Sequence, residues 1–137
     1  MAERQLILVS ACLAGLQTRY DSKIVDHPQC REALEGSIWI PVCPEQLGGL
    51  PTPRRPADIV GGSGSAVLEK RARVVCDDGS DLTEHFMRGA EMVLEIASRL
   101  KVDKVYLKAR SPSCGVTRTG VTAALLHTHG FELEEFG

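Results

Sequence analysis

Short apolar runs alternate with helix-like segments along this chain. The runs have the composition of buried strands, and they cover residues 5–10, 37–42, 102–108 and 131–135. Apolar residues at helical spacing and terminal signals predict helices between them, over residues 27–36, 81–100 and 120–128. Such an alternation is typical of a parallel sheet with right-handed crossovers. The pattern predicts one α/β domain over residues 1–137, with a mainly parallel sheet flanked by helices in a Rossmann-like three-layer sandwich.

The stretch between the second strand and the long helix has no regular pattern. Residues 44–56 hold four prolines in thirteen positions, and proline fixes φ and removes a donor, so neither helix nor central strand is expected. A loop this long in a small domain is more often functional than idle. Residues 61–65 extend this irregular region, and partial alternation over 66–76 predicts an edge ribbon. Asp81, with Glu84 three residues later, matches a capping box.

Three of the five cysteines follow strand-like runs, namely Cys12, Cys43 and Cys114. Because the carboxyl ends of parallel strands share one edge, where open α/β sheets bind ligands, we expect the three thiols to meet there. Convergent thiols in a reducing cell indicate a metal or an iron–sulfur cluster, and three thiols leave one coordination position open. Cys30 and Cys76 have no such setting and are expected to be packing or surface residues.

Composition removes several classes of function. Sixteen basic and eighteen acidic side chains give a net charge of −2, so the chain has no excess of positive charge that would attract nucleic acid. Aromatic residues make up 4% of the chain, too few for platforms that stack single-stranded bases. No apolar stretch approaches the ~20 residues that span a bilayer, and residues 1–5 lack the apolar core of a signal peptide. We therefore expect a cytoplasmic protein without a disulfide framework.

A carboxylate accompanies the second of these cysteines. Glu45 lies two residues after Cys43, and Pro44 fixes their spacing, so Glu45 could act as a general base toward a metal-bound substrate. The alternative is an ordinary exposed carboxylate. Arg54, nearby in the chain, either solvates its loop or anchors an anionic or carbonyl-bearing ligand.

Two hydroxyls accompany the third cysteine. Ser111 and Ser113 precede Cys114 in the segment Ser-Pro-Ser-Cys-Gly. They are candidates for proton transfer beside the thiol, and the alternative is that they cap the following turn. Gly115 would let the backbone approach a bulky ligand closely.

The residues around the cysteines form a series of motifs spread over nearly the whole chain. They read Val9-Ser10-Ala11-Cys12-Leu13-x-Gly15, Arg19-Tyr20-Asp21, Pro41-Val42-Cys43-Pro44-Glu45-x-x-Gly48-Gly49-Leu50, Pro53-Arg54-x-Pro56-Ala57, Ser111-Pro112-Ser113-Cys114-Gly115 and Gly120-Val121-Thr122-Ala123-Ala124-Leu125-Leu126. In this order the motifs resemble the short single-domain thiouracil desulfidases, a family long catalogued as a domain of unknown function.

The resemblance implies a cofactor and a reaction. Cys12, Cys43 and Cys114 would hold a [4Fe–4S] cluster through three of its irons, and the fourth iron would bind the sulfur of a thiolated pyrimidine such as 2-thiouracil. Glu45, helped by Ser111, would activate the water that attacks the ring carbon. Sulfur would leave onto the cluster as hydrosulfide, without net redox change.

The same motifs supply the remaining site candidates. Ser113 is a third catalytic candidate, and the candidate substrate-binding residues are Ser10, Gly48 and Arg54. The expected partner is a small thiolated base or thioamide, bound by a monomer or homodimer, with no nucleic acid and no membrane.

The chain departs from the family pattern at two places. Thr18 stands where the family commonly has a second cysteine, which supports a ligand set of three. The segment from Cys114 to Gly120 is about ten residues shorter than is usual in the family, so we expect a wider or wetter pocket.

Two alternatives to the desulfidase interpretation remain open. One is a zinc hydrolase that uses three thiolates and a bound water. The other is a non-catalytic iron–sulfur protein that senses oxygen or carries sulfur or iron.

Overall fold

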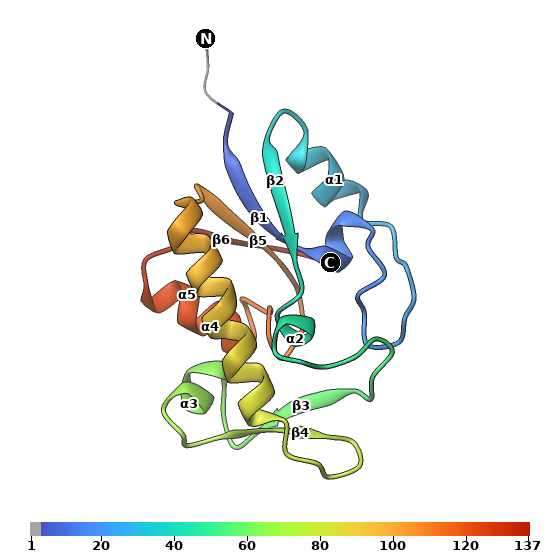
Figure 1. The fold of residues 1–137 in the computed structure, drawn as a ribbon, viewed down its shortest axis with the longest axis vertical. Coiled ribbons are helices and arrows are strands. Elements are labelled where there is room, and N and C mark those ends of the chain that lie inside the picture. Colours follow the sequence, from blue (N-terminus) through green and yellow to red (C-terminus); the bar gives the residue numbers. More distant parts are fainter. Residues whose placement is uncertain (1–3) are drawn as a thin grey trace.

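A four-stranded parallel sheet forms the centre of the molecule (Figure 1). The computed structural model describes residues 4–137. The prediction about a signal peptide concerns residues 1–5, of which residues 1–3 lie outside the described residues. The strand order is β2-β1-β5-β6, where the strands are β1 (Leu6–Ser10), β2 (Ile38–Val42), β5 (Lys104–Lys108) and β6 (Leu133–Phe136). The four strand-like runs of the sequence are these four strands, and the predicted mainly parallel α/β fold is confirmed.

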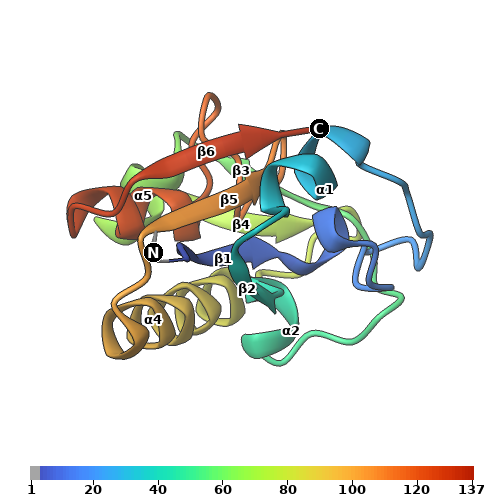
Figure 2. The ribbon, with the colours of Figure 1, turned by 90° about the horizontal axis from the view of Figure 1, so that it is seen from above.

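Helices cover both faces of this sheet, which gives the expected three layers (Figure 2). One face is covered by α4 (Thr83–Leu100) and α5 (Val121–Thr128), and the other by the short 3-10 helix η1 (Ala11–Ala14) and α1 (Pro28–Leu34). Along β1, Leu8 belongs to the first of these interfaces, whereas Ile7 and Val9 belong to the second. Because β1 is buried on both faces, its sequence is apolar throughout rather than alternating.

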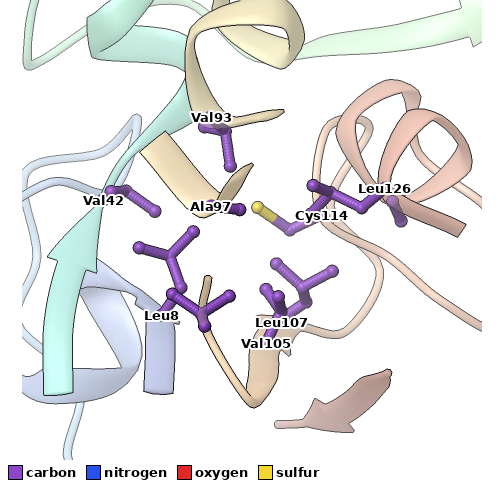
Figure 3. Packing of buried hydrophobic residues seen from close by; sticks show 10 residues of the cluster. Leu8, Val42, Val93, Ala97, Val105, Leu107, Cys114 and Leu126 are labelled. Atoms are coloured by element: carbon purple, nitrogen blue, oxygen red, sulfur yellow. The ribbon is translucent and has the colours of Figure 1, made fainter. Parts of the chain in front are cut away.

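The main core lies between the sheet and the layer of α4 and α5 (Figure 3). Apolar side chains from the strands, including Leu8, Val105 and Leu107, pack there against apolar side chains from the two helices. Cys114, only 4% exposed, packs among them although it belongs to a turn. Its thiol therefore has an apolar setting on one side. Within residues 4–137, no helix is long and apolar enough to cross a membrane.

A small antiparallel sheet lies beside this core and replaces part of the region expected to be irregular. It consists of β3 (Ala57–Val60) and β4 (Arg73–Cys76), with α3 (Gly64–Leu68) between them in the chain. Apolar residues of this unit pack against Phe86 and Ala90 of α4 and Val121 of α5. The ribbon predicted over 66–76 is therefore correct only for β4, because residues 66–68 bury their apolar side chains as a helical turn instead.

The prediction that residues 44–56 contain no helix is wrong. A short helix, α2 (Pro44–Leu47), begins directly after Cys43. Pro44 occupies the first turn, where the backbone N–H of a helix has no intrahelical partner and the fixed φ of proline already fits. Proline breaks a helix when it lies in the interior, but at this first-turn position Pro44 begins one.

The long helix α4 begins one residue later than the capping box at Asp81 predicts. Its N-cap is Leu82 and carries no side-chain cap, whereas Asp81 accepts a hydrogen bond from the backbone N–H of Thr83 at 2.9 Å. The Thr83 hydroxyl in turn accepts a bond from the backbone N–H of Val74 at 3.0 Å. Side chains at this helix start thus join α4 to β4 instead of closing the box.

Candidate active site

A cavity of about 220 Å³ opens at the carboxyl ends of β1, β2 and β5. Three segments bring a thiol to its wall: Cys12 lies in η1 after β1, Cys43 is the N-cap of α2 after β2, and Cys114 lies in the turn between β5 and α5. Parallel pairing of β1 with both neighbours aligns these strand ends, so thiols far apart in sequence line one space. The topological argument from the sequence therefore places the three cysteines together correctly.

Burial shifts all three thiols toward their protonated form. It raises the pKa of Cys114 to about 12, against weaker opposing effects of hydroxyl hydrogen bonds. Burial also raises the pKa of Cys12 and of Cys43, and the nearby Cys43 thiol adds to the shift at Cys12. Thiolates, not thiols, bind metals, so loading this cavity with a cationic group must release protons.

The spacing of the three thiols argues against a single zinc ion. Zn–S bonds of about 2.3 Å in a tetrahedron place the sulfur atoms less than about 4 Å apart. Within residues 4–137, three metal-ligating atoms lie within 4.8 Å of one another only at Cys76, Asp77 and Asp78. In that group Arg55 already binds the Asp77 carboxylate at 2.6 Å. The three cavity cysteines are not such a group, so at least two of their sulfur atoms lie more than 4.8 Å apart.

Glu45 is held at both carboxylate oxygens. Ser113 donates its hydroxyl proton to Oε2 at 3.0 Å, and Arg54 Nε donates to Oε1 at 3.0 Å. The Glu45 side chain is 15% exposed and lines the cavity. A carboxylate can accept about four hydrogen bonds, so positions remain for a water molecule or a substrate N–H group.

The two serines form a directed hydrogen-bond chain that ends on Glu45. Ser111 Oγ accepts bonds from the backbone N–H groups of Ser113 (3.2 Å) and Cys114 (3.1 Å). With its two lone pairs engaged, Ser111 donates its own proton to Ser113 Oγ at 3.0 Å. Ser111 thus caps the turn and also orients the hydroxyl of Ser113. Its part in proton transfer stays a prediction.

The three candidate substrate-binding residues have different positions. Arg54 and Ser10 line the cavity, and Ser10 Oγ accepts a bond from the backbone N–H of Lys108 at 3.0 Å. Gly48 is not among the residues that line the cavity. It packs against α4, where a Cβ would overlap the backbone carbonyl of His85. The structure therefore does not bring Gly48 to the site, because close helix packing explains the need for glycine there.

Three cationic residues on the cavity wall, Arg19, Lys108 and Arg110, are not among the candidates from the sequence. Lys108 ends β5, and its Nζ donates a bond to the carbonyl of Ala109 at 3.0 Å; burial lowers the pKa of this amine. Arg19 binds both oxygens of the Asp21 carboxylate, at 3.0 and 2.9 Å. The position of Lys108 at the carboxyl end of a predicted strand is the signal that could have identified it.

The segment after Cys114 is compact and anchored from the far end of the chain. Glu135 accepts hydrogen bonds from the backbone N–H groups of Val116 (2.9 Å) and Thr117 (3.2 Å) and from the Thr117 hydroxyl (2.7 Å). Arg118 and Thr119 line a separate cavity of about 30 Å³, which shares Ser111 with the main one. The segment 115–119 is thus anchored to β6, and it does not line the main cavity.

This chain is similar in sequence and in structure to known proteins, and the comparisons agree with one another. Residues 7–135 match the family model described as 2-thiouracil desulfurase. The uncharacterized protein YbbK of Bacillus subtilis (strain 168) is 39% identical, with 93% of each chain covered. Among solved structures, the [4Fe-4S]-dependent thiouracil desulfidase TudS superposes with a TM-score of 0.79 at 36% identity, covering 96% of this chain and 91% of that chain.

Proposed function

Because this chain belongs to the 2-thiouracil desulfurase family and is a thiouracil desulfidase-like enzyme, we propose how its cavity carries out the reaction. A [4Fe–4S] cluster binds to Cys12, Cys43 and Cys114, and Glu45 is the general base. The substrate is a small thiolated base such as 2-thiouracil. Water replaces the sulfur, so that C=S becomes C=O and hydrosulfide leaves without net redox change.

The donor set fits such a cluster. Three thiols from separate segments line one cavity, and at least two of their sulfur atoms lie more than 4.8 Å apart, wider than the spacing around a tetrahedral zinc ion. Arg19, Arg54 and Lys108 line the same cavity and offset the negative charge that three thiolates bring. When bound, the cluster supplies an open iron that attracts the soft sulfur of the substrate and polarises its C–S bond.

The protein's own groups supply the proton transfer. Glu45 takes a proton from water as the oxygen attacks the ring carbon. The bonds from Ser113 and Arg54 fix the carboxylate plane, so the remaining acceptor positions point in a constant direction. That partly buried carboxylate, held at both oxygens beside three convergent thiols, is the observation that carries the proposal. A protein that only stores or senses a cluster has no need of a fixed base.

The test is anaerobic reconstitution with iron and sulfide, followed by conversion of 2-thiouracil to uracil. We expect wild-type protein to bind about four irons per chain and to turn over. Glu45→Gln should retain the iron and lose about 10²- to 10⁴-fold in kcat, the usual range for a lost general base. Glu84→Gln, at an exposed position on α4, is the matched control and should behave as wild type.

Three outcomes contradict parts of this proposal. A loaded cluster without turnover supports a sensor or carrier, and zinc in place of iron supports a hydrolase. Full activity of Glu45→Gln shows that another group is the base.

A further inference from the structure

We infer that Arg54 is a positioning residue that fixes the orientation of Glu45 and ties it to Cys43, and that it is not a substrate anchor. This inference rests on the proposed function, because it assigns Arg54 a part in the same reaction. The side chain of Arg54 is 8% exposed although it belongs to a proline-rich surface loop. A guanidinium buried so fully in a loop requires an explanation beyond solvation.

The hydrogen bonds of the guanidinium leave no donor for a substrate. An arginine side chain has five N–H groups. Nε donates to Glu45 Oε1 (3.0 Å), and Nη1 donates to the carbonyl of Pro51 (3.2 Å) and to Thr52 Oγ1 (2.9 Å). Nη2 donates to the carbonyl of Thr18 (2.9 Å) and approaches Cys43 Sγ at 3.9 Å. All five directions thus end on groups of the protein.

These bonds join segments that would otherwise meet only at the cavity. The Thr18 carbonyl belongs to the loop that follows η1, which carries Cys12, whereas Glu45 lies in the helix after Cys43. The backbone N–H of Arg54 adds a bond to the carbonyl of Tyr20 at 2.8 Å. Arg54 therefore sets the distance between the loops of two cysteines and the carboxylate between them. A lysine, with a single ammonium and no planar fork, cannot reproduce this pattern.

The contact with Cys43 adds a second expected effect. A hydrogen bond and a positive charge next to a ligating sulfur stabilise the more negative, reduced form of an iron–sulfur cluster. Removal of the guanidinium should therefore lower the reduction potential of the bound cluster. A residue that contacts only the substrate would leave this potential unchanged when no substrate is present.

The experiment compares Arg54→Gln and Arg54→Lys with Arg55→Gln in the reconstituted protein. Arg55 is the matched control, since it is the neighbouring arginine, its side chain is 62% exposed, and it pairs with Asp77 away from the cavity. Iron content, kcat, KM for 2-thiouracil and the reduction potential are measured for each. We also combine Arg54→Gln with Glu45→Asp, which keeps a carboxylate but withdraws it from the guanidinium.

A positioning role predicts that Arg54→Gln lowers kcat by about 100-fold, the cost of a misplaced catalytic group. KM should change little, the potential should fall, and iron should be retained. Arg54→Lys should recover only part of kcat. In the Glu45→Asp background, Arg54→Gln should cause a much smaller further loss, because its effect passes through Glu45. Arg55→Gln should match wild type in every measurement.

A different result separates failure of the inference from failure of the proposed function. A raised KM at constant kcat identifies Arg54 as a substrate anchor, and unchanged kinetics or loss of iron in both Arg54 variants also overturns the inference. If Arg54→Gln does not fold, Arg54→Lys and the potential decide. Wild-type protein that binds iron but leaves 2-thiouracil intact contradicts the proposed function, and the inference then falls with it.

Discussion

The cavity wall and the packed layers each contain buried cysteines, and the two groups differ in an instructive way. Cys114, on the wall, is 4% exposed, and Cys30, in the layer of α1, is not exposed at all. Burial raises the pKa of both thiols, to about 12 and about 11. Neither burial nor protonation therefore distinguishes a proposed ligand from a packing residue in this protein.

Position along the strands makes the distinction. Cys12, Cys43 and Cys114 follow the carboxyl ends of three adjacent parallel strands and line one cavity. Cys30 packs with Leu13 and Leu34 on the face of the sheet, and Cys76 ends a strand of the small antiparallel sheet. The three thiols at the shared edge thus line one cavity together, whereas Cys30 packs among apolar side chains and Cys76 lies next to the Asp77 carboxylate.

The strongest test of this comparison is removal of single thiols. Each of the substitutions Cys12→Ala, Cys43→Ala and Cys114→Ala should abolish iron binding. The cluster would keep only two of its three protein ligands. Cys30→Ala and Cys76→Ala should retain iron and turnover. Iron per chain and visible absorbance after anaerobic reconstitution measure this, with circular dichroism to show that each variant folds. Iron loss in a folded Cys30→Ala variant would contradict the assignment.

A smaller effect is expected from the hydroxyl that holds Glu45 from the other side. Ser113→Ala removes the bond to Oε2 and interrupts the chain from Ser111. A hydrogen bond to a charged group is worth about 1.5–3 kcal/mol, so we expect kcat to fall roughly 10- to 100-fold with iron unchanged. Steady-state kinetics measure this, and Ser98→Ala, exposed on α4, is the control. Wild-type kcat in Ser113→Ala would show that Arg54 alone orients the base.

A substitution at Gly48 tests whether this motif glycine is needed for substrate binding at the cavity or for close packing against α4. Its Cβ would overlap the carbonyl of His85, so Gly48→Ala should destabilise the protein by about 1–3 kcal/mol, as overpacking does. Denaturant unfolding of the apo-protein measures this directly. A substrate-binding role predicts the opposite result, a raised KM in a variant of unchanged stability.

The smallest effect concerns pH and the apo-protein. Burial raises the pKa of Cys114 above its ordinary value of 9.0, so the folded chain keeps a proton that the unfolded chain loses. The free energy of unfolding should therefore fall as the pH rises above 9, by about 1 kcal/mol per pH unit for this thiol. Urea titrations of the apo-protein between pH 8 and 10, on either side of about 9, measure the slope. Cys114→Ala should reduce it, and an unchanged slope would contradict the burial of this thiol.

Local signals were sufficient for most of the fold. Apolar runs identified all four strands of the parallel sheet, helical spacing identified α4, and proline and glycine signals at the ends identified α1 and α5. The errors lie where the chain is rich in proline and glycine, at α2, α3 and β3. A helix of four or five residues, such as α2 or α3, is too short for a helical period to emerge. The packing of apolar side chains of α3 and β3 against α4 and α5 decides the conformation of that part of the chain.

The order of residues is enough to show that three cysteines follow strands and that Glu45 and two serines lie beside them. Which atoms meet depends on the folded chain. The bond from Ser113 to Glu45 spans 68 residues, and the one from Arg54 spans 9 residues of irregular chain. Residue order specifies strands through local side-chain preferences, but contacts between distant segments depend on how the layers pack. Packing likewise gave Arg54 five protein acceptors and gave Gly48 a neighbouring helix.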